Sequence, residues 1–190
     1  MKLVFASNNR HKIQEIQNLL PATIEVLSLQ DIGCTEDIAE TADTIEGNAI
    51  IKANYVTEKY GYDCFADDSG LEIDYLEGAP GVYSARFAGE QKNDQDNIDK
   101  VLNELDGVDN REANFKTVIA LNLNKQQHLF TGIIKGKITT TQIGSQGFGY
   151  DPIFQPNNYD ITFAEMNQQE KSAISHRGLA VKQLLDFLTK

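Results

Sequence analysis

Residues 65–71 read Phe65-Ala66-Asp67-Asp68-Ser69-Gly70-Leu71, an apolar lead-in followed by two adjacent carboxylates, a hydroxyl residue and a glycine. Apolar and polar residues then alternate through Ile73 and Tyr75, which is the period of a strand. The pattern predicts a strand that brings the acidic pair to a tight turn at Ser69-Gly70, where the side chains stay open to solvent. Because neighbouring carboxylates repel each other, a divalent cation or a proton would have to neutralise them, unless they are simply solvated turn residues.

The size and composition of the chain suit one globular domain. Its 190 residues are enough to bury a sizeable core, and we expect a single domain over 1–190. The two cysteines, Cys34 and Cys64, show neither close metal-ligand spacing nor a disulfide framework. No apolar run has the length of a membrane span or of a signal-peptide core. We therefore expect a reduced, cytoplasmic setting.

The net charge restricts the class of partner. A formal charge of −11 argues against nonspecific binding to nucleic acid polymers or to anionic membranes. It allows a small anionic substrate, provided that cations are gathered locally at the binding site.

The start of the chain supplies one place for such cations. Residues 2–6 predict a strand, and apolar residues at helical spacing follow from Ile13 to Pro21. Free N–H groups at the start of that helix would form an anion site with the polar residues before it. An ordinary helix cap by Ser7 or Asn8 explains the same pattern equally well. The segment lacks the glycine pattern of dinucleotide-binding and P-loop folds.

The remaining periodicities predict alternating strands and helices. In the helix starting at Thr44, Asp43 and Glu46 are placed to form a capping box, and Lys52 either points back toward the site or is solvated. The predicted elements are a strand over 24–29, an exposed acidic loop over 35–43, a helix over 44–60, a helix over 93–105, strands over 115–123 and 128–138 joined near Asn124-Lys125, and a last helix containing Leu179 to Leu188.

Two further clusters stand out in the second half of the chain. Gly147-Phe148-Gly149-Tyr150-Asp151-Pro152 places aromatic rings and a carboxylate between glycines, which suits either a flat base or a packed aromatic turn. Residues 171–178 crowd Lys171, His176 and Arg177 at the entry of the last helix, where they would attract an anion.

The clusters together resemble a known family, the inosine triphosphate pyrophosphatases, also called XTP/dITP diphosphatases or non-standard purine NTP pyrophosphatases. Pro80-Gly81-Val82-Tyr83-Ser84-Ala85-Arg86 resembles the bacterial branch in particular. Four blocks match the family in order across nearly the whole chain: Ser7-x-Asn9-x-x-Lys12, Ala66-Asp67-Asp68-Ser69-Gly70-Leu71, Gly147-Phe148-Gly149-Tyr150-Asp151-Pro152, and Lys171-Ser172-Ala173-Ile174-Ser175-His176-Arg177.

The resemblance implies hydrolysis of ITP, dITP or XTP to the monophosphate and pyrophosphate, which removes deaminated purines from the nucleotide pool. It implies Mg²⁺ held by Glu40 and Asp68, with Asp68 as general base. It also implies a homodimer. The substrate-binding residues that it implies are Ser7, Asn8, Asn9, Arg10, His11, Lys12 and Lys52 for the phosphates, with Arg86 as a further candidate, Ser69, Lys171, His176 and Arg177 for the nucleotide, and Phe148, Gly149, Tyr150 and Asp151 for the base.

One segment departs from the family. Where the family usually has Thr-Phe-x-Glu-Asn-Ala, this chain has Thr44-Ile45-Glu46-Gly47-Asn48-Ala49. Gly47 removes an acidic side chain and lowers helix propensity by up to about 1 kcal/mol. The departure changes what we expect of additional metal coordination and of the catalytic rate, but it does not change the expected class of reaction.

We therefore expect an α/β fold with a long, twisted mixed sheet flanked by helices, and two lobes with a central substrate cleft. Two alternatives to the main hypothesis stay open. One is a pyrophosphatase for other modified or pyrimidine nucleotides, and the other is a nucleotide-binding sensor without turnover. The presence of Asp68, Glu40 and both cation clusters argues against the sensor.

Overall fold

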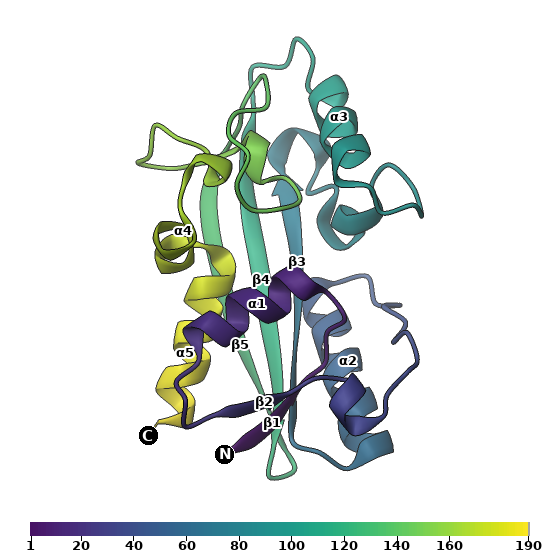
Figure 1. Ribbon diagram of the computed structural model, residues 1–190. Helices are drawn as coiled ribbons and strands as arrows, with labels where there is room; N and C mark the ends of the chain where they lie inside the picture. The colour runs from purple at the N-terminus through teal and green to yellow at the C-terminus, as the bar shows by residue number, and fades with distance from the viewer. Residues whose placement is uncertain (190) are drawn as a thin grey trace. The chain divides into compact units, whose positions relative to one another are not determined.

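The computed structural model describes residues 1–189 and has the predicted α/β architecture (Figure 1). Six strands form one mixed sheet in the order β2-β1-β3-β4-β5-β6, with β1 parallel to β2 and β3, and β5 antiparallel to β6. The strands are β1 (Lys2–Phe5), β2 (Glu25–Leu27), β3 (Cys64–Ile73), β4 (Glu112–Leu123), β5 (Gln126–Ile138) and β6 (Phe154–Pro156). The helices that flank the sheet are α1 (Arg10–Leu19), α2 (Ile45–Tyr60), α3 (Asp94–Glu104), α4 (Gln168–Ile174) and α5 (His176–Leu188).

The chain divides into two compact units, each assembled from separated segments. Unit 1 comprises Met1–Asp68, Thr117–Gly132 and the residues from Arg177 onward, and unit 2 comprises Ser69–Lys116 and Ile133–His176. Strands β3, β4 and β5 each contribute residues to both units. The boundary within β3 falls between Asp68 and Ser69, inside the stretch from Phe65 to Leu71.

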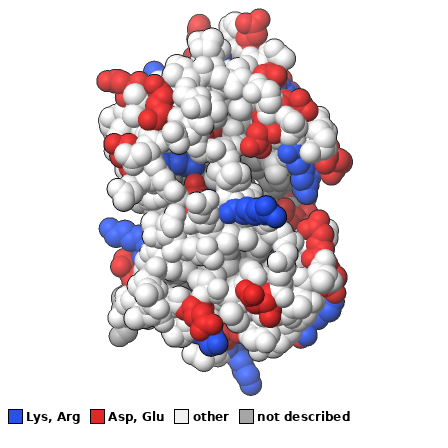
Figure 2. Space-filling view, viewed as in Figure 1, with Lys and Arg blue, Asp and Glu red and all other residues white. Residues whose placement is uncertain are grey.

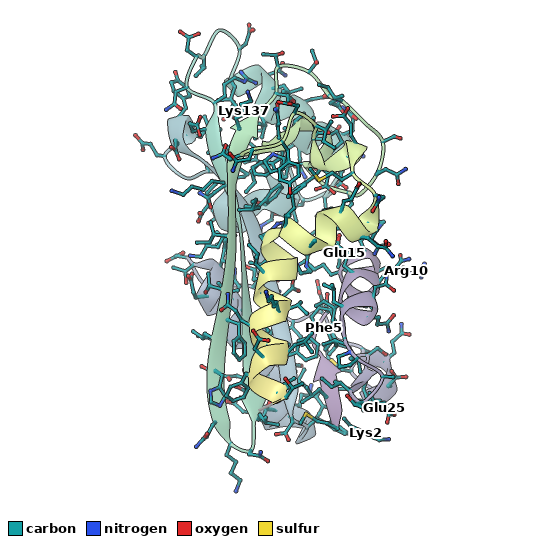
Figure 3. The ribbon with its side chains drawn as sticks, turned by 90° about the vertical axis from the view of Figure 1, so that its left-hand side faces the viewer. Lys2, Phe5, Arg10, Glu15, Glu25 and Lys137 are labelled. Carbon is teal, nitrogen blue, oxygen red and sulfur yellow. The ribbon has the colours of Figure 1, made fainter. Side chains whose placement is uncertain are left out.

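The core of unit 1 lies between the sheet and two helices that are far apart in the sequence. Figures 1 and 3 show α1 and α5 on the same side of the sheet, and Phe5 lies on that side in Figure 3. Phe5 and Phe65 stack there with ring centroids 4.8 Å apart. Ile16 of α1 and Leu184 of α5 belong to the same buried cluster. The helical spacing of apolar residues in both helices is therefore explained by one shared core.

The core of unit 2 is built around aromatic rings. Phe115 of β4 meets Phe154 edge-on at 4.7 Å between centroids and stacks on Phe163 at 6.1 Å. Ile98 and Val101 of α3 are buried in the same cluster. This core fixes the segments that flank the predicted base-binding residues.

The predicted turn after the acidic pair is wrong. Strand β3 runs from Cys64 to Ile73 without interruption, and it lies between β1 and β4 within the sheet. The apolar alternation before and after Asp67-Asp68 belongs to one strand rather than to two. A strand that is buried along most of its length must keep its backbone groups bonded, and a continuous ladder achieves this. Ser69-Gly70 is therefore strand rather than turn.

Several predicted boundaries are correct and others shift. The turn between β4 and β5 is at Asn124-Lys125, where both residues have positive φ (51° and 66°), as a two-residue hairpin turn requires. Helix α1 is capped by Asn9 rather than by Ser7 or Asn8. Helix α2 is capped by Thr44, so the predicted capping box of Asp43 and Glu46 is wrong.

The cations predicted to crowd one helix entry lie on two helices. Lys171 is in α4, whereas His176 and Arg177 are the first residues of α5. Asn167 caps α4 and Ser175 separates the two helices, which ends the first helix before the second begins.

The acidic character of the chain is visible on its surface. On the face shown in Figure 2, acidic side chains are scattered and basic side chains are isolated. Within residues 1–189, every helix is too short or too polar to cross a lipid bilayer.

Candidate functional site

The site residues of unit 1 form a charged cluster, defined here as Lys12, Glu40, Lys52, Asp67, Asp68 and Arg177. Successive residues of a strand point to opposite faces of its sheet. Accordingly, Asp67 meets Lys12 of α1 and Arg177 of α5, whereas Asp68 meets Lys52 of α2. The two neighbouring carboxylates thus form their ion pairs with different cations, and these cations offset the repulsion between them.

Asp67 is a fully buried carboxylate with two cationic partners. Its oxygens lie 3.1 Å from Lys12 Nζ and 3.2 Å from Arg177 Nε. Burial by itself would raise the pKa of Asp67, but the charges of Lys12 and Arg177 outweigh it and hold the pKa well below its ordinary range. Burial lowers the pKa of Lys12, and Asp67 opposes that effect. Asp67 therefore stays ionised and holds two cations in place.

Glu15 is a member of this network that the sequence analysis missed. Its carboxylate pairs with Arg177 Nη1, and Figure 3 shows Glu15 on α1 beside the start of α5. Burial opposes the charged form of Arg177, but Asp67 and Glu15 raise its pKa. Glu15 follows Lys12 by three residues, a spacing that places both on one face of a helix. That spacing was the available signal.

Among the described residues, Asp68 is the carboxylate of the charged cluster whose hydrogen bonding is least complete. It is 6% exposed, its Oδ1 lies 3.7 Å from Lys52 Nζ, and its buried Oδ2 has no hydrogen-bond partner among residues 1–189. Burial raises the pKa of Asp68 above its ordinary value, although Lys52 and Lys12 act in the opposite direction. A carboxylate with a raised pKa and an open oxygen can accept a proton or bind a cation.

Lys52 joins Glu40 to this part of the cluster. Its Nζ donates to Glu40 Oε1, so the lysine of α2 contacts both carboxylates that the family resemblance assigns to metal binding. Burial lowers the pKa of Lys52, but Asp68, Asp67 and Glu40 together raise it above its ordinary value. Lys52 remains a cation, and it lies beside Glu40 and Asp68 rather than in solvent.

The predicted phosphate loop is ordered by its own side chains. Asn9 Oδ1 accepts hydrogen bonds from the backbone N–H groups of His11 and Lys12, and Ser7 Oγ accepts one from Asn9. Asn8, Arg10 and His11 are exposed at the start of α1. The side chain of Lys12 enters the charged cluster through its ion pair with Asp67.

The site residues of unit 2 form an aromatic cluster, defined here as Phe148, Asp151, Phe163, Lys171 and His176. Lys171 Nζ lies 2.7 Å from Asp151 Oδ2 and 4.8 Å from the centre of the Phe148 ring. The N–H of Phe148 also donates to Asp151 Oδ2, at 2.9 Å. Asp151 therefore fixes the loop that carries Phe148 and holds the lysine over its ring.

Other predicted residues of unit 2 serve this arrangement. The Gly149 N–H donates to Asp94 Oδ2 at 2.8 Å, and Tyr150, which is buried, donates from its hydroxyl to Ser84 O at 2.7 Å. Ser69 is half-buried in β3 at the first position of unit 2. Tyr150 thus packs inside the unit and anchors the segment containing Ser84.

His176 is packed as an aromatic ring. It stacks on Phe115 with centroids 4.6 Å apart and an interplanar angle of 9°, and it also stacks on Phe163. Arg177, which follows it, makes its ion pairs with Asp67 and Glu15 of unit 1. The two residues predicted to act as a pair are therefore held by different sets of partners.

Gly47 is explained by close packing against the loop before α2. A Cβ built at Gly47 would lie 2.5 Å from Ala42 Cβ and 3.0 Å from Thr44 Oγ1. The position is helical and needs no unusual φ, so the glycine supplies room rather than backbone freedom. The segment carrying Glu40 approaches α2 where the family usually has a larger residue.

We expect Gly47→Ala to lower the free energy of unfolding by about 1–2 kcal/mol, because overpacking outweighs the gain in helix propensity. Urea unfolding followed by circular dichroism measures the change. The double variant Ala42→Gly/Gly47→Ala makes room for the new methyl group and should recover most of the loss. A single variant as stable as the wild type would show that the loop moves away without cost.

Comparisons with known proteins agree along nearly the whole chain. The model of the Ham1 family matches residues 3–187. A dITP/XTP pyrophosphatase from Flavobacterium psychrophilum is 67% identical over 187 residues, which cover 98% of each chain. The solved structures of a Staphylococcus aureus Ham1 protein and a Coxiella burnetii HAM1 protein each have a TM-score of 0.92, with 39% and 42% identity, and each match covers 100% of this chain and 98% of the other.

Proposed function

Since the chain belongs to the Ham1 family, we propose that it hydrolyses the non-standard purine nucleoside triphosphates ITP, dITP and XTP to the nucleoside monophosphate and pyrophosphate. It is a hydrolase acting on a phosphoric anhydride bond. Its role is to remove deaminated purines from the nucleotide pool. We take residues 1–190 as one pyrophosphatase domain.

One observation supports the chemical part of this proposal above the others. Asp68 is a buried carboxylate with a raised pKa, an oxygen without a hydrogen-bond partner among residues 1–189, and a lysine nearby. Such a group is costly to keep in a protein interior unless it has a function. We assign Asp68 as the general base that takes a proton from the attacking water.

The carboxylates of unit 1 also fit a magnesium ion. Among residues 1–189, no three His, Cys, Asp or Glu side chains converge as a complete metal site. Mg²⁺ usually takes only one or two protein carboxylates and fills its other positions with water and phosphate oxygens. Glu40 and Asp68 would hold it. Their shared partner Lys52 shows that the two carboxylates lie close together, and Asp68 Oδ2 has no hydrogen-bond partner among the described residues. When bound, the ion would neutralise phosphate oxygens.

The remaining steps use the chain's own residues. Water attacks phosphorus at the bond between the α and β phosphates, its proton passes to Asp68, and the bond to the departing pyrophosphate breaks. Lys12 and Lys52 would stabilise the negative charge of the pyrophosphate. Lys12 is already held by Asp67, so it is positioned before the substrate arrives. The residues from Ser7 to His11 would supply further contacts to the phosphates.

We assign base recognition to the aromatic cluster. Phe148 offers a ring for stacking, and Lys171 is a donor held beside that ring by Asp151. Donors facing the 6-oxo group of hypoxanthine or xanthine would be mismatched against the amino group of adenine, a difference of a few kcal/mol. Gly149, Tyr150, Ser69, His176 and Arg177 would complete the contacts to the nucleotide.

The proposal is tested by pyrophosphate release from ITP, XTP, ATP and GTP, measured with Mg²⁺ and with EDTA. We expect rapid release from ITP and XTP that EDTA abolishes, and much slower release from ATP and GTP. Equal release from all four would reject the base assignment and keep the hydrolase. ITP binding without any release would instead favour a nucleotide sensor.

We further propose that the protein is a homodimer in the cytoplasm. The homodimer rests on the family resemblance, and the cytoplasmic setting rests on two cysteines that suggest no disulfide framework. Sedimentation velocity at micromolar concentration measures the first, and a monomer under those conditions would reject it.

A further inference from the structure

The loop that carries Glu40 is attached to α2 at three levels. Near the end of the helix, Glu36 pairs with Lys59 and accepts a hydrogen bond from the Tyr60 hydroxyl at 2.7 Å. In the middle, Glu40 pairs with Lys52. Near the start, the backbone N–H of Ala42 donates to Asn48 Oδ1 at 2.9 Å. The third attachment is the one that fixes backbone rather than a side chain, and it lies two residues from Glu40.

Asn48 is an unusual residue to find at this place. It is 0% exposed, and its Nδ2 has no hydrogen-bond partner among residues 1–189. The Ala42 N–H requires an acceptor, so the side-chain oxygen of Asn48 must face Ala42. The Asn48 side chain therefore cannot be flipped to exchange the positions of its oxygen and its NH₂ group. A buried donor without a partner is unfavourable, and an apolar side chain of similar volume would avoid that loss. Stability of α2 is therefore a poor explanation for an asparagine here.

The other side of Ala42 is restricted as well. Its methyl group occupies the space beside Gly47, where a Cβ would lie only 2.5 Å away. The hydrogen bond from Asn48 and the contact with Gly47 thus hold the same loop residue from two neighbouring positions of the helix. Backbone held in this way sets where the preceding residues, and with them the Glu40 carboxylate, meet Lys52.

We infer that Asn48 is a positioning residue, which fixes the Glu40 carboxylate for a divalent cation by binding the Ala42 N–H. The inference rests on the metal role given to Glu40 in the proposed function. Residues that orient metal ligands without touching the ion typically change metal affinity by about 10- to 100-fold when they are replaced.

The test is binding of Mn²⁺ alone, without nucleotide, measured by electron paramagnetic resonance on the full chain. We expect Asn48→Leu to weaken Mn²⁺ binding by about tenfold, and the Mg²⁺ concentration that half-saturates turnover to rise in parallel. Asn48→Asp keeps an acceptor for Ala42 and should not weaken Mn²⁺ binding. Ala42→Pro removes the same hydrogen bond from the loop side, so it tests the inference even if Asn48→Leu does not fold.

Asn54 is the matched control on the same helix. Its side-chain oxygen accepts hydrogen bonds from Asn122 and Gln127, away from the Glu40 loop. We expect Asn54→Leu to lower the melting temperature and to leave Mn²⁺ affinity unchanged. Equal losses of affinity in the Asn48 and Asn54 variants would overturn the inference, because they would indicate a general weakening of α2.

Glu40→Gln, measured beside the other variants, separates the two hypotheses. If Glu40→Gln weakens Mn²⁺ binding and neither Asn48→Leu nor Ala42→Pro does, the positioning role is wrong and the metal role stands. If Glu40→Gln binds Mn²⁺ as the wild type does, the metal role of Glu40 is wrong and the inference fails with it.

Discussion

Asp68→Asn is expected to lower turnover of ITP by about 10³-fold, the range over which general acid–base groups contribute. The substitution removes the proton acceptor and one of the two proposed metal ligands. It keeps the shape of the side chain, and among residues 1–189 the contact that Asp68 would lose is a distant ion pair, 3.7 Å from Lys52. The fold should therefore survive, and ITP should still bind.

Single-turnover kinetics and calorimetric binding of ITP measure the two quantities separately. Circular dichroism of the variant serves as the control for folding. Near-normal turnover in a folded Asp68→Asn variant would show that the general base lies elsewhere. Loss of binding together with turnover would instead assign Asp68 mainly to the metal.

Asp67→Asn is expected to act on stability instead. The variant leaves the buried cations of Lys12 and Arg177 without their shared carboxylate, although Arg177 keeps Glu15. Removing one partner of a buried ion pair typically costs about 3–5 kcal/mol. We expect a loss of that size in the free energy of unfolding at pH 7, measured by urea titration.

The pH dependence of this difference has a definite sign. Because the pKa of Asp67 is held well below its ordinary range, its stabilising effect is fully present above the ordinary pKa of about 4. The effect is lost as pH falls below that value. The stability of the wild type should therefore approach that of Asp67→Asn in acid.

Glu25→Gln provides the control, because the Lys2–Glu25 pair between β1 and β2 is exposed. Exposed ion pairs contribute little, so this variant should unfold at nearly the wild-type urea concentration. Equal stability of Asp67→Asn and the wild type at pH 7 would contradict the role given to Asp67.

The sequence supported the fold class and the reaction class because both depend on local patterns. Strand and helix periods identify β1, α1, α2, β4 and β5, and the residue blocks resemble those of one family. The same patterns do not report which residues meet across the fold. Ser69-Gly70 has the composition of a turn, and only pairing with neighbouring strands keeps it extended.

The partners of the charged residues are the part that local reasoning could not supply. Lys12 and Arg177 are separated by most of the chain and meet because α1 and α5 cover the same side of the sheet. The packing of Ala42 against Gly47 likewise depends on the path of a loop without periodicity. Such contacts arise from tertiary structure. Sequence propensity alone identifies charged residues on a helix and the low helix propensity of Gly47, but not the residues that they contact.

The placement of Asp67 and Asp68 on one strand has a consequence for insertions and deletions. Because side chains alternate with a period of two, a shift of β3 by one residue would exchange the faces on which the two carboxylates lie. The ion-paired aspartate would then stand where the proposed base belongs, and the base would face Lys12 and Arg177. Gain or loss of a single residue between Cys64 and Asp67 should therefore inactivate the protein even if the sheet still forms.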